Sequence, residues 1–364
     1  MSTLPAIALL GRKDQPTDAV EEYCRHLSQS LQEHDIQLEI RRVPWELHGW
    51  PASLDALRLM AMQWRGRWVL VQYTALAWSA RGFPHRILRV FNILKNAGAR
   101  IGVVFHDVEP FAAVTLSAKF RRWIQLRAMR QILSRADLAV FTVPIAKIDW
   151  LSPAPPANAI FIPVGPNLPV SASSSVSHQP PTVAVFSITG GDAGIRETQT
   201  IVSAVRFASQ KLGSLRLSVF GRHSEWREAE LREGLRDVPV AISVEDVLPD
   251  DQVAQRFCDS DVLLFVRGGI SSRRSSAVAG IACGLPVIAS ANSETAPPIT
   301  DAGVVLVSLD DQEELNAALV RVLSDSPYRH ALAARSRAIY KHYFSWPVIA
   351  QSYAARLKAG PGPL

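Results

Sequence analysis

Short apolar runs alternate with longer amphipathic stretches along the whole chain. The runs predict strands at residues 5–10, 36–42, 68–72, 101–105, 138–142, 159–163, 183–188, 215–220, 239–242, 262–266, 286–289 and 304–307. Apolar residues at three- and four-residue spacing predict helices between most of them, including 18–33, 84–97, 196–211, 225–235, 312–323 and 327–342. Strands that alternate with helices in this way form parallel sheets with helices on both faces.

One segment interrupts the alternation. Residues 163–182 are rich in Pro and Ser and carry no periodic apolar pattern, which is typical of an exposed linker. Half of the predicted strands lie on each side of it. The sequence therefore predicts an α/β protein with two Rossmann-like domains, residues 1–165 and 183–344, joined by a linker at 166–182. Ligands of parallel sheets bind at the carboxyl ends of strands, so we expect the two sheets to face a central cleft.

The composition agrees with two folded domains. The chain has 364 residues, of which 48% are apolar and 20% charged, and this excludes a disordered protein. Three widely spaced cysteines, Cys24, Cys258 and Cys283, predict neither a disulfide framework nor a metal site. The run from Ala6 to Leu10 is too short for a signal peptide, and no window of about 18 residues is apolar and uncharged. We expect a cytoplasmic protein, with any membrane contact peripheral and at the inner face.

Much of the excess positive charge lies in residues 119–135, a predicted helix without acidic residues. Its apolar positions are Phe120, Trp123, Ile124, Leu126, Met129 and Leu133, and its basic positions are Lys119, Arg121, Arg122, Arg127, Arg130 and Arg135. Such a helix either rests on anionic lipid or is a solvated surface, and the pattern leaves both open. The chain lacks the aromatic and basic modules of nucleic-acid-binding proteins, so we expect no nucleic-acid partner.

The most informative candidate site is the stretch 256–290, which predicts a helix end, a strand, a loop, a helix, a turn and a strand. Its loop contains Ser271, Ser272, Arg273, Arg274 and Ser275 directly before the predicted helix. Serine at such a position typically caps a helix. The N–H groups and the dipole of a helix N-terminus also attract anions, and the two arginines add positive charge. The loop is therefore an anion site or a capped surface helix.

Residues 282–289, Ala-Cys-Gly-Leu-Pro-Val-Ile-Ala, resemble the C-terminal core of glycosyltransferase family 4. The sequences around Arg222, Pro249 and Trp346 are similar to further motifs of that family, in the same order. The resemblance implies the two-domain GT-B architecture and a retaining transfer from a nucleotide-diphosphate sugar bound by the C-terminal domain. It also implies that Arg222 lies beside the donor phosphates and that a helix at 345–358 packs back on the N-terminal domain.

The chain departs from this family at its paired glutamates, which fall on Ser271 and Ala279 by register from Gly284. In the family, the first glutamate lies near the donor sugar and the second contacts the ribose. Two interpretations follow. Either the serines and arginines of residues 271–275 hold the diphosphate instead, or the site has lost activity.

A glycine-rich loop after the strand at 183–188 is a second candidate site. It contains Gly190 and Gly191, and Arg196 lies in the helix that follows. Glycines let backbone N–H groups approach a phosphate closely. By position, Arg196 resembles the basic residue with which the family holds the donor diphosphate. An ordinary turn between a strand and a helix is the alternative.

Polar residues also follow three predicted strands of the N-terminal half. Gly11 follows the first strand, in a turn that the family places over the donor phosphates and the acceptor. Tyr73 ends the third strand, and His106, Asp107 and Glu109 follow the fourth. Polar residues at such ends are more often binding than core residues. His106 resembles a family histidine near the reacting sugar, so we assign it the catalytic role and the others the acceptor side of the cleft.

Asp259-Ser260-Asp261 has the spacing of metal-dependent glycosyltransferases, but it joins a helix end to a buried strand, and we interpret it as a structural turn. We expect neither a metal nor another cofactor, because basic side chains and helix dipoles stabilise a leaving diphosphate in GT-B enzymes.

The sequence thus predicts a metal-independent, retaining glycosyltransferase for polysaccharide or glycoconjugate synthesis. Its expected partners are a nucleotide-sugar donor and an unidentified acceptor. The acceptor would be lipid-linked if the basic helix rests on anionic lipid. The alternatives are a non-catalytic GT-B protein that binds a nucleotide or a partner, and a nucleotide-sugar epimerase.

Overall fold

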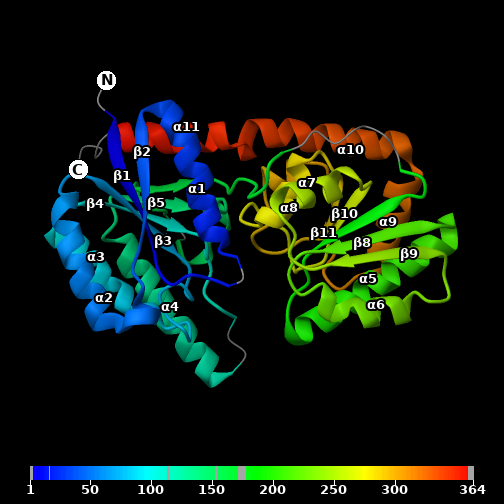
Figure 1. Ribbon diagram of the computed structural model, residues 1–364, viewed down its shortest axis with the longest axis horizontal. Coiled ribbons are helices and arrows are strands. Elements are labelled where there is room, and N and C mark those ends of the chain that lie inside the picture. The colour runs from blue at the N-terminus through cyan, green and yellow to red at the C-terminus, as the bar shows by residue number, and fades with distance from the viewer. Residues whose placement is uncertain (1–2, 16, 113–114, 152–153, 171–177, 360–364) are drawn as a thin grey trace. The chain divides into compact units, whose positions relative to one another are not determined.

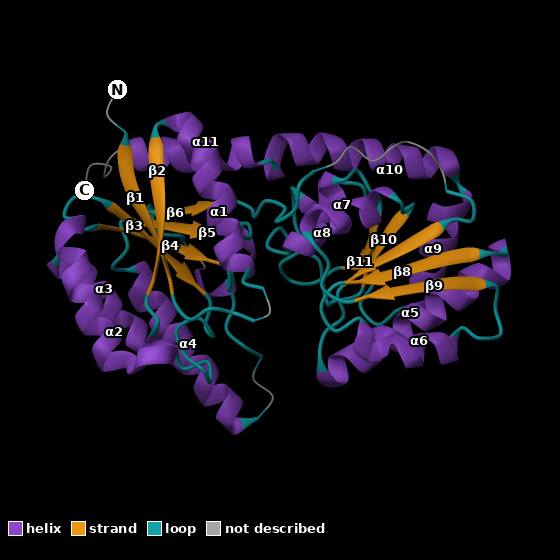
Figure 2. Cartoon of the chain, in the orientation of Figure 1, coloured by secondary structure: helices purple, strands orange, loops and turns teal. Residues whose placement is uncertain are grey.

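The computed structural model describes residues 3–15, 17–112, 115–151, 154–170 and 178–359. The chain forms two compact units: unit 1 comprises Met1–Pro163 and Trp346–Leu364, and unit 2 comprises Val164–Ser345. Each unit is built around one sheet with helices on both faces (Figures 1 and 2). Residues 171–177 of the predicted linker lie outside the described residues.

Unit 1 contains a six-stranded parallel sheet in the order β2-β1-β3-β4-β5-β6. Its strands are β1 (Leu4–Leu10), β2 (Ile36–Arg42), β3 (Trp68–Tyr73), β4 (Arg100–Phe105), β5 (Leu138–Phe141) and β6 (Ala159–Phe161). All of β3 is buried, as a continuous apolar run predicts for a strand covered on both faces. One face carries α2 (Trp45–Ala61), α3 (Ile87–Asn96) and α4 (Leu116–Leu133), and the other carries α1 (Ala19–Leu31) and α11 (Trp346–Lys358).

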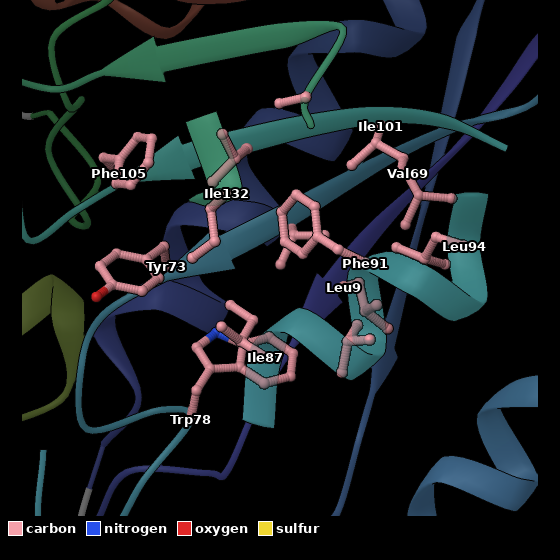
Figure 3. Close-up of a cluster of buried hydrophobic side chains, with 14 of the residues drawn as sticks. Leu9, Val69, Tyr73, Trp78, Ile87, Phe91, Leu94, Ile101, Phe105 and Ile132 are labelled. Carbon is pink, nitrogen blue, oxygen red and sulfur yellow. The ribbon is translucent and has the colours of Figure 1, made fainter. Parts of the chain in front are cut away.

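A large hydrophobic core of unit 1 lies between the sheet and the helices α2, α3 and α4. Figure 3 shows Phe91 and Leu94 of α3 against strand side chains that include Val69 and Ile101. Burial of each such side chain contributes roughly 1.5–3 kcal/mol. The indole N–H of Trp78 is satisfied inside this core by the carbonyl of Gln72, at 2.8 Å.

Unit 2 contains a second six-stranded parallel sheet, in the order β12-β11-β10-β7-β8-β9. Its strands are β7 (Thr182–Phe186), β8 (Leu215–Phe220), β9 (Val240–Glu245), β10 (Val262–Phe265), β11 (Val287–Ser290) and β12 (Val304–Val307). One face carries α5 (Gly191–Leu212), α6 (Glu228–Gly234) and α9 (Gln312–Ser324). The other carries α7 (Asp250–Cys258), α8 (Ser275–Ala282) and α10 (Ser326–Ile339).

All twelve predicted strands are present, and their ends differ from the prediction by three residues or fewer. The predicted helices are also present, although α5 starts at Gly191 rather than at residue 196. The apolar pattern did not indicate α2, because Gly49, at φ 71°, and Pro51 interrupt it.

The C-terminal helices belong to different units. Helix α10 lies in unit 2, a π-helical segment follows at Tyr340–Phe344, and α11 lies in unit 1 beside α1. The buried hydroxyls of Tyr23 and Tyr353 are 2.8 Å apart, and the indole of Trp68 donates to the carbonyl of Leu357 at 3.0 Å. These bonds satisfy the polar atoms that the packing of α11 buries.

The tyrosine pair gives a test of this packing. Tyr353→Phe should lower the free energy of unfolding of unit 1 by about 1–3 kcal/mol, because it leaves the buried Tyr23 hydroxyl without its partner. Removing both hydroxyls should cost less than the sum of the two single changes, because no polar group then stays unsatisfied.

Urea unfolding followed by tryptophan fluorescence reports on unit 1, which holds most tryptophans. Tyr343→Phe, at an exposed position, is the control. Additive effects in the double variant would contradict the pairing.

Candidate functional site

The carboxyl edge of the sheet in unit 2 borders a cavity of about 680 Å³. Residues of α5, the ends of β10, β11 and β12 and the start of α9 line it. Arg196 and Glu197 lie on its α5 wall, and Val266 and Gly268 on its β10 wall. Asp310 lies on the wall that precedes α9. Cavities at this edge of an open parallel sheet are the usual ligand sites of such folds.

The loops at this edge hold unusual backbone conformations. Ser187, His223 and Asp310 follow β7, β8 and β12, and they have φ values of 65°, 63° and 65°. Such a conformation costs about 1–3 kcal/mol in a residue other than glycine and is concentrated at binding sites. Contacts between the loops maintain it: Ser187 N donates to Phe220 O at 2.7 Å, and His223 Nδ1 lies 3.1 Å from Ile188 O. The loop between β7 and α5 is therefore held in place by the end of β8 and the loop that follows it.

The N-terminus of α5 carries a carboxylate from its own helix. Gly190 is the N-cap, and no side chain caps the helix there. The buried carboxylate of Glu197 instead reaches back and accepts a hydrogen bond from Thr189 N at 2.7 Å. The positive end of the helix dipole stabilises a negative charge at this point. Glu197 thus occupies part of the anion site that the glycine-rich loop predicted.

Two arginines flank this loop from neighbouring strands. The register that pairs β10 with β7 and β7 with β8 places Arg267, Ile188 and Arg222 at the same level, just beyond the strand ends. A hydrogen bond of 3.0 Å from Ile188 N to Arg222 O confirms the alignment on one side. Adjacent strands are about 4.8 Å apart, so the backbones of the two arginines are separated by roughly 10 Å.

Arg267 is charged in a poorly solvated position. Its Nε atom is buried, and it has no hydrogen-bond partner among the described residues. Burial lowers the pKa of Arg267, the carboxylate of Glu197 raises it, and the charge of Arg222 lowers it again. A guanidinium with an unused donor is suited to bind an anion such as a phosphate.

The loop before α8 is organised differently from the prediction. The N-cap of α8 is Arg274, without a side-chain cap, so no serine caps this helix, and Ser275 is instead its first residue. The cause is Glu294, whose buried carboxylate accepts hydrogen bonds from Ser271 Oγ at 3.0 Å and Arg273 Nε at 2.7 Å. Ser272 is also fully buried. The charge of Arg273 is therefore neutralised within the protein.

The predicted donor residues fall into separate groups. Arg196 is exposed and lines the cavity of unit 2, whereas no residue from Ser271 to Ser275 lines it. Gly190 and Gly191 form the start of α5, with Arg222 beside them. The structure does not bring Arg273 and Arg196 together at this cavity.

The carboxyl edge of the sheet in unit 1 borders a second cavity, of about 270 Å³. Gly11 and Asp107, both predicted site residues, line it together with Gln72 and Thr74. Asp107 Oδ2 accepts a hydrogen bond from Ala75 N at 3.0 Å. The predicted turn after β1 and the polar residues after β4 therefore meet at one place.

His106 lies behind this cavity rather than in its lining. Its Nε2 atom is 2.8 Å from Oε1 of Gln72, and its ring packs edge-on against Tyr23 with centroids 5.0 Å apart. Gln72 thus links the histidine to the cavity wall. Glu109 is 3.9 Å from Arg122 of α4, and it does not line the cavity either.

Tyr73 does not have the open position that the sequence predicted. Its ring is fully buried in the core of unit 1, 5.2 Å from the ring of Phe105 (Figure 3). Burial raises the pKa of Tyr73 well above its usual value, and the carboxylate of Asp107 raises it further. Tyr73 is the last residue of a strand buried on both faces, which explains why its side chain joins the core.

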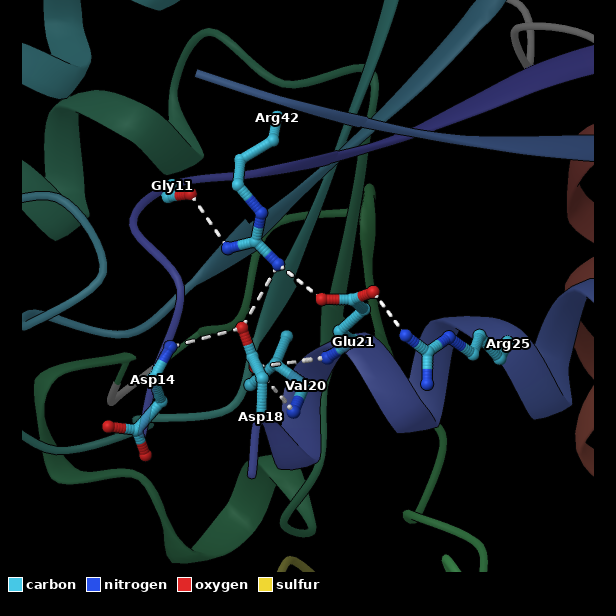
Figure 4. A network of polar contacts seen from close by, with 7 residues as sticks. All are labelled: Gly11, Asp14, Asp18, Val20, Glu21, Arg25 and Arg42. Atoms are coloured by element: carbon cyan, nitrogen blue, oxygen red, sulfur yellow. Dashed lines mark hydrogen bonds and ion pairs between the residues drawn. The ribbon is translucent and has the colours of Figure 1, made fainter. Parts of the chain in front are cut away.

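A polar network fixes the turn that leads into α1 (Figure 4). Asp18 caps α1, accepting hydrogen bonds from Val20 N at 3.2 Å and Glu21 N at 3.1 Å. Arg42 of β2 donates to Gly11 O at 3.0 Å, to Asp18 at 3.0 Å and to Glu21 at 2.8 Å. The charges of this turn are therefore balanced by a residue of the neighbouring strand.

Sequence reasoning missed Arg267, Glu197 and Glu294. Arg267 directly follows a predicted strand, so the rule that singled out His106 could have found it. The carboxylate of Glu197 accepts a hydrogen bond from a residue eight positions earlier, and that of Glu294 accepts hydrogen bonds from residues 21 and 23 positions earlier. Short sequence motifs do not indicate contacts between residues so far apart in the chain.

The prediction that Asp259-Ser260-Asp261 is a structural turn is confirmed. Asp261 is buried and accepts hydrogen bonds from the backbone of His178 at 3.2 Å and Thr182 at 2.8 Å. Across the described ranges, no cluster of three His, Cys, Asp or Glu residues could hold a metal ion.

No protein-family model matches the chain, and no curated protein matches it significantly in sequence. Solved structures match over its whole length. Sucrose-phosphate synthase from Thermosynechococcus elongatus has a TM-score of 0.72 at 16% identity, with 98% of each chain covered. HepE of Anabaena, in complex with UDP and glucose, has a TM-score of 0.67 at 15% identity, covering 98% of this chain and 100% of HepE. A glycosyltransferase from Rickettsia africae has a TM-score of 0.68 at 13% identity, with 99% of each chain covered.

These likenesses confirm the predicted fold class. The chain is an α/β protein with two Rossmann-like units, and it shares the GT-B fold of these structures.

The contacts of Glu294 lead to a prediction about the loop before α8. Glu294→Gln should speed amide hydrogen exchange in residues 270–275 by about tenfold or more, because Arg273 and Ser271 lose a charged acceptor. Hydrogen-exchange mass spectrometry of the full chain measures this. Glu33→Gln, at an exposed position, should leave the loop unchanged. Unchanged exchange in both variants would show that the carboxylate does not hold the loop.

Proposed function

We propose that the chain is a retaining glycosyltransferase of family 4. It transfers a hexosyl group from a nucleotide-diphosphate sugar to an acceptor hydroxyl, in polysaccharide or glycoconjugate synthesis. The pair Arg222 and Arg267, beside the start of α5 and the cavity of unit 2, is the observation that carries the proposal. HepE, which shares the fold, was solved with UDP and glucose, and this supports a UDP-sugar donor.

Unit 2 binds the donor in this proposal. The nucleoside occupies the cavity of about 680 Å³, with Arg196 on its wall, and the diphosphate reaches Arg222, Arg267 and the loop at Gly190 and Gly191. Each charge-assisted hydrogen bond to the diphosphate contributes roughly 1.5–3 kcal/mol.

The same groups favour departure of the nucleoside diphosphate. The bond between the anomeric carbon and the diphosphate oxygen breaks, and negative charge develops on that oxygen. Arg222 and Arg267 stabilise this charge, which is the task that a metal ion performs in other transferases. We propose that no metal is required.

Unit 1 binds the acceptor in this proposal. Its cavity of about 270 Å³ takes the acceptor ring, with Gly11 and Asp107 in the wall. We keep His106 as the proposed catalytic side chain, since Gln72 fixes its ring and also lines the cavity. The acceptor oxygen forms the new bond to the anomeric carbon, and its proton leaves with the diphosphate.

We also propose that α4 contacts an anionic membrane at its cytoplasmic face, where a lipid-linked acceptor would be available. No helix in the described part of the chain is long and apolar enough to cross a membrane. Phe120 and Trp123, which the sequence pattern placed on the apolar face of α4, are 58% and 57% exposed and stack at 6.1 Å. Leu116 is exposed beside them, and basic side chains surround the patch. Exposed aromatic residues among basic ones suit the surface of an anionic bilayer.

The arginine pair gives the test of donor binding. Arg267→Ala and Arg222→Ala should each raise the Kd for UDP by about tenfold or more, because each removes a charge-assisted bond to phosphate. Uridine, which lacks the phosphates, should bind the variants and the parent alike. Arg236→Ala, which removes an exposed arginine next to Glu233, is the control. Calorimetry on the full chain measures the constants, after a thermal-shift screen of UDP, GDP and ADP. Unchanged affinity for the preferred diphosphate in both variants would rule out this site.

Turnover of labelled nucleotide sugars separates the proposed function from its alternatives. Transfer or hydrolysis supports the glycosyltransferase. Binding without turnover indicates the non-catalytic protein that the missing glutamates at Ser271 and Ala279 left open. A change of ring configuration without an acceptor indicates the epimerase.

The membrane contact is tested with vesicles. The full chain should float with vesicles of phosphatidylglycerol and phosphatidylcholine but not with phosphatidylcholine alone, and high salt should weaken the binding. Replacing Phe120 and Trp123 by Ala should abolish flotation, whereas Trp226→Ala, at an exposed position in unit 2, should not. Equal binding to neutral vesicles, or binding that survives the double change, would contradict the proposal.

A further inference from the structure

We infer that His223 is a further ligand of the donor diphosphate and that it takes up a proton when the donor binds. This inference rests on the proposed function, because it takes the loop at Gly190 and Gly191 as the place of the diphosphate. It follows from the position of the imidazole ring at that loop, from the hydrogen bond that fixes its protonated nitrogen, and from the charges around it.

The imidazole of His223 lies directly beside the N-cap of α5. A Cβ atom added to Gly190 would lie 3.7 Å from Cε1 of the ring and 3.9 Å from each ring nitrogen. The indole of Trp226 packs on the ring, with centroids 4.3 Å apart. An anion bound at Gly190 therefore lies within reach of the imidazole.

A backbone contact determines which ring nitrogen is available to a ligand. Nδ1 of His223 lies 3.1 Å from Ile188 O. A carbonyl oxygen only accepts hydrogen bonds, so Nδ1 carries a proton. In the neutral ring, Nε2 then has a lone pair and no hydrogen. Within the described part of the chain, Nε2 has no hydrogen-bond partner.

The state of Nε2 links donor binding to proton uptake. The phosphate oxygens of a nucleotide sugar accept hydrogen bonds, and they repel the lone pair of a neutral imidazole. Once Nε2 of His223 has taken up a proton, it donates to a phosphate oxygen and the ring is a cation. Diphosphate binding and protonation of His223 therefore favour each other by the same factor.

The carboxylate of Glu197 gives this extra cation a purpose. It accepts a hydrogen bond from Thr189 N at 2.7 Å, so it compensates the start of α5 before any ligand binds. A diphosphate at Gly190 gains little from the helix dipole and lies close to a second negative group. A charge on His223, which follows β8, offsets this repulsion from the side of the sheet opposite Arg267, which follows β10.

His223 is the group at this loop whose charge can change near neutral pH. Carboxylates and guanidinium groups ordinarily keep their charge between about pH 6 and pH 8, whereas histidine changes it there. His223 forms no ion pair with another described residue. Arg227 pairs with Glu230, and Glu245 pairs with Arg256. The charged side chains on the elements that meet at the ring are Asp192, Arg196 and Glu197 of α5, Arg222, Glu225 and Arg227 of its own segment, and Glu245 and Asp246 at and after the end of β9.

The test uses a donor whose phosphates keep their charge. UDP-glucose is suitable because neither of its phosphates titrates near neutral pH, whereas a terminal phosphate does so near pH 6. GDP-mannose and ADP-glucose are titrated alongside, and the sugar that binds best is used. Calorimetry on the full chain at neutral pH, in PIPES and in Tris, counts the protons because these buffers differ in ionisation enthalpy. We expect uptake of about half a proton or more per donor, and a Kd that rises about tenfold or more from pH 6 to pH 8. Binding without proton uptake overturns the inference.

Variants locate the proton. His223→Asn should abolish the uptake and the pH dependence, so that affinity falls about tenfold at pH 6 and changes little at pH 8. Asparagine tolerates the φ of 63° at this position. His330→Gln, at an exposed position on α10 of unit 2, should behave like the parent. Proton uptake that persists in His223→Asn would show that another group titrates.

The outcome is separable from that of the proposed function. If a nucleotide sugar binds with proton uptake at His223 but is not turned over, the inference stands and the glycosyltransferase proposal fails. If it is turned over but binds without proton uptake, the reverse holds. Failure of all three nucleotide sugars to bind overturns both.

Discussion

Parallel pairing of neighbouring strands determines where the chemistry of this protein can lie. In both sheets every strand runs in the same direction, so all strand ends and the loops that follow them meet at one edge. Arg267 and Arg222 lie far apart in the chain, yet they flank the same loop because of strand register alone. In unit 1, the same constraint brings Gly11 and Asp107 to one cavity.

A second theme is the placement of carboxylates beside positive groups. Asp18 caps α1, Glu197 reaches the start of α5, and Glu294 holds Arg273 beside α8. Each places a negative charge against a helix N-terminus or an arginine in a poorly solvated region, where an uncompensated positive charge would be costly. In unit 2, by contrast, the buried Nε of Arg267 has no hydrogen-bond partner among the described residues.

The sequence predicted the fold more fully than the site. Strands such as β3 are buried on both faces and therefore appear as nearly continuous apolar runs, which hydropathy along the sequence readily indicates. The positions of Gly11 and Asp107 followed from the same pattern, since both come directly after a strand. The role of Arg273 could not be predicted, because Glu294 neutralises it from another loop. The prediction that Tyr73 lines the cleft was wrong. The apolar pattern indicates where a strand ends, but it does not indicate whether the last side chain points into the core.

Unit 1 is made of two pieces of chain that are separated by the whole of unit 2. During synthesis on the ribosome, α11 therefore emerges only after every residue of unit 2 has been made. Until then, Tyr23 of α1 and Trp68 of β3 lack their hydrogen-bond partners on α11. Unit 2 is continuous in sequence and meets no such delay. The nascent chain thus passes through a stage in which one half is complete and the other still presents apolar surface, the kind of species that chaperones bind.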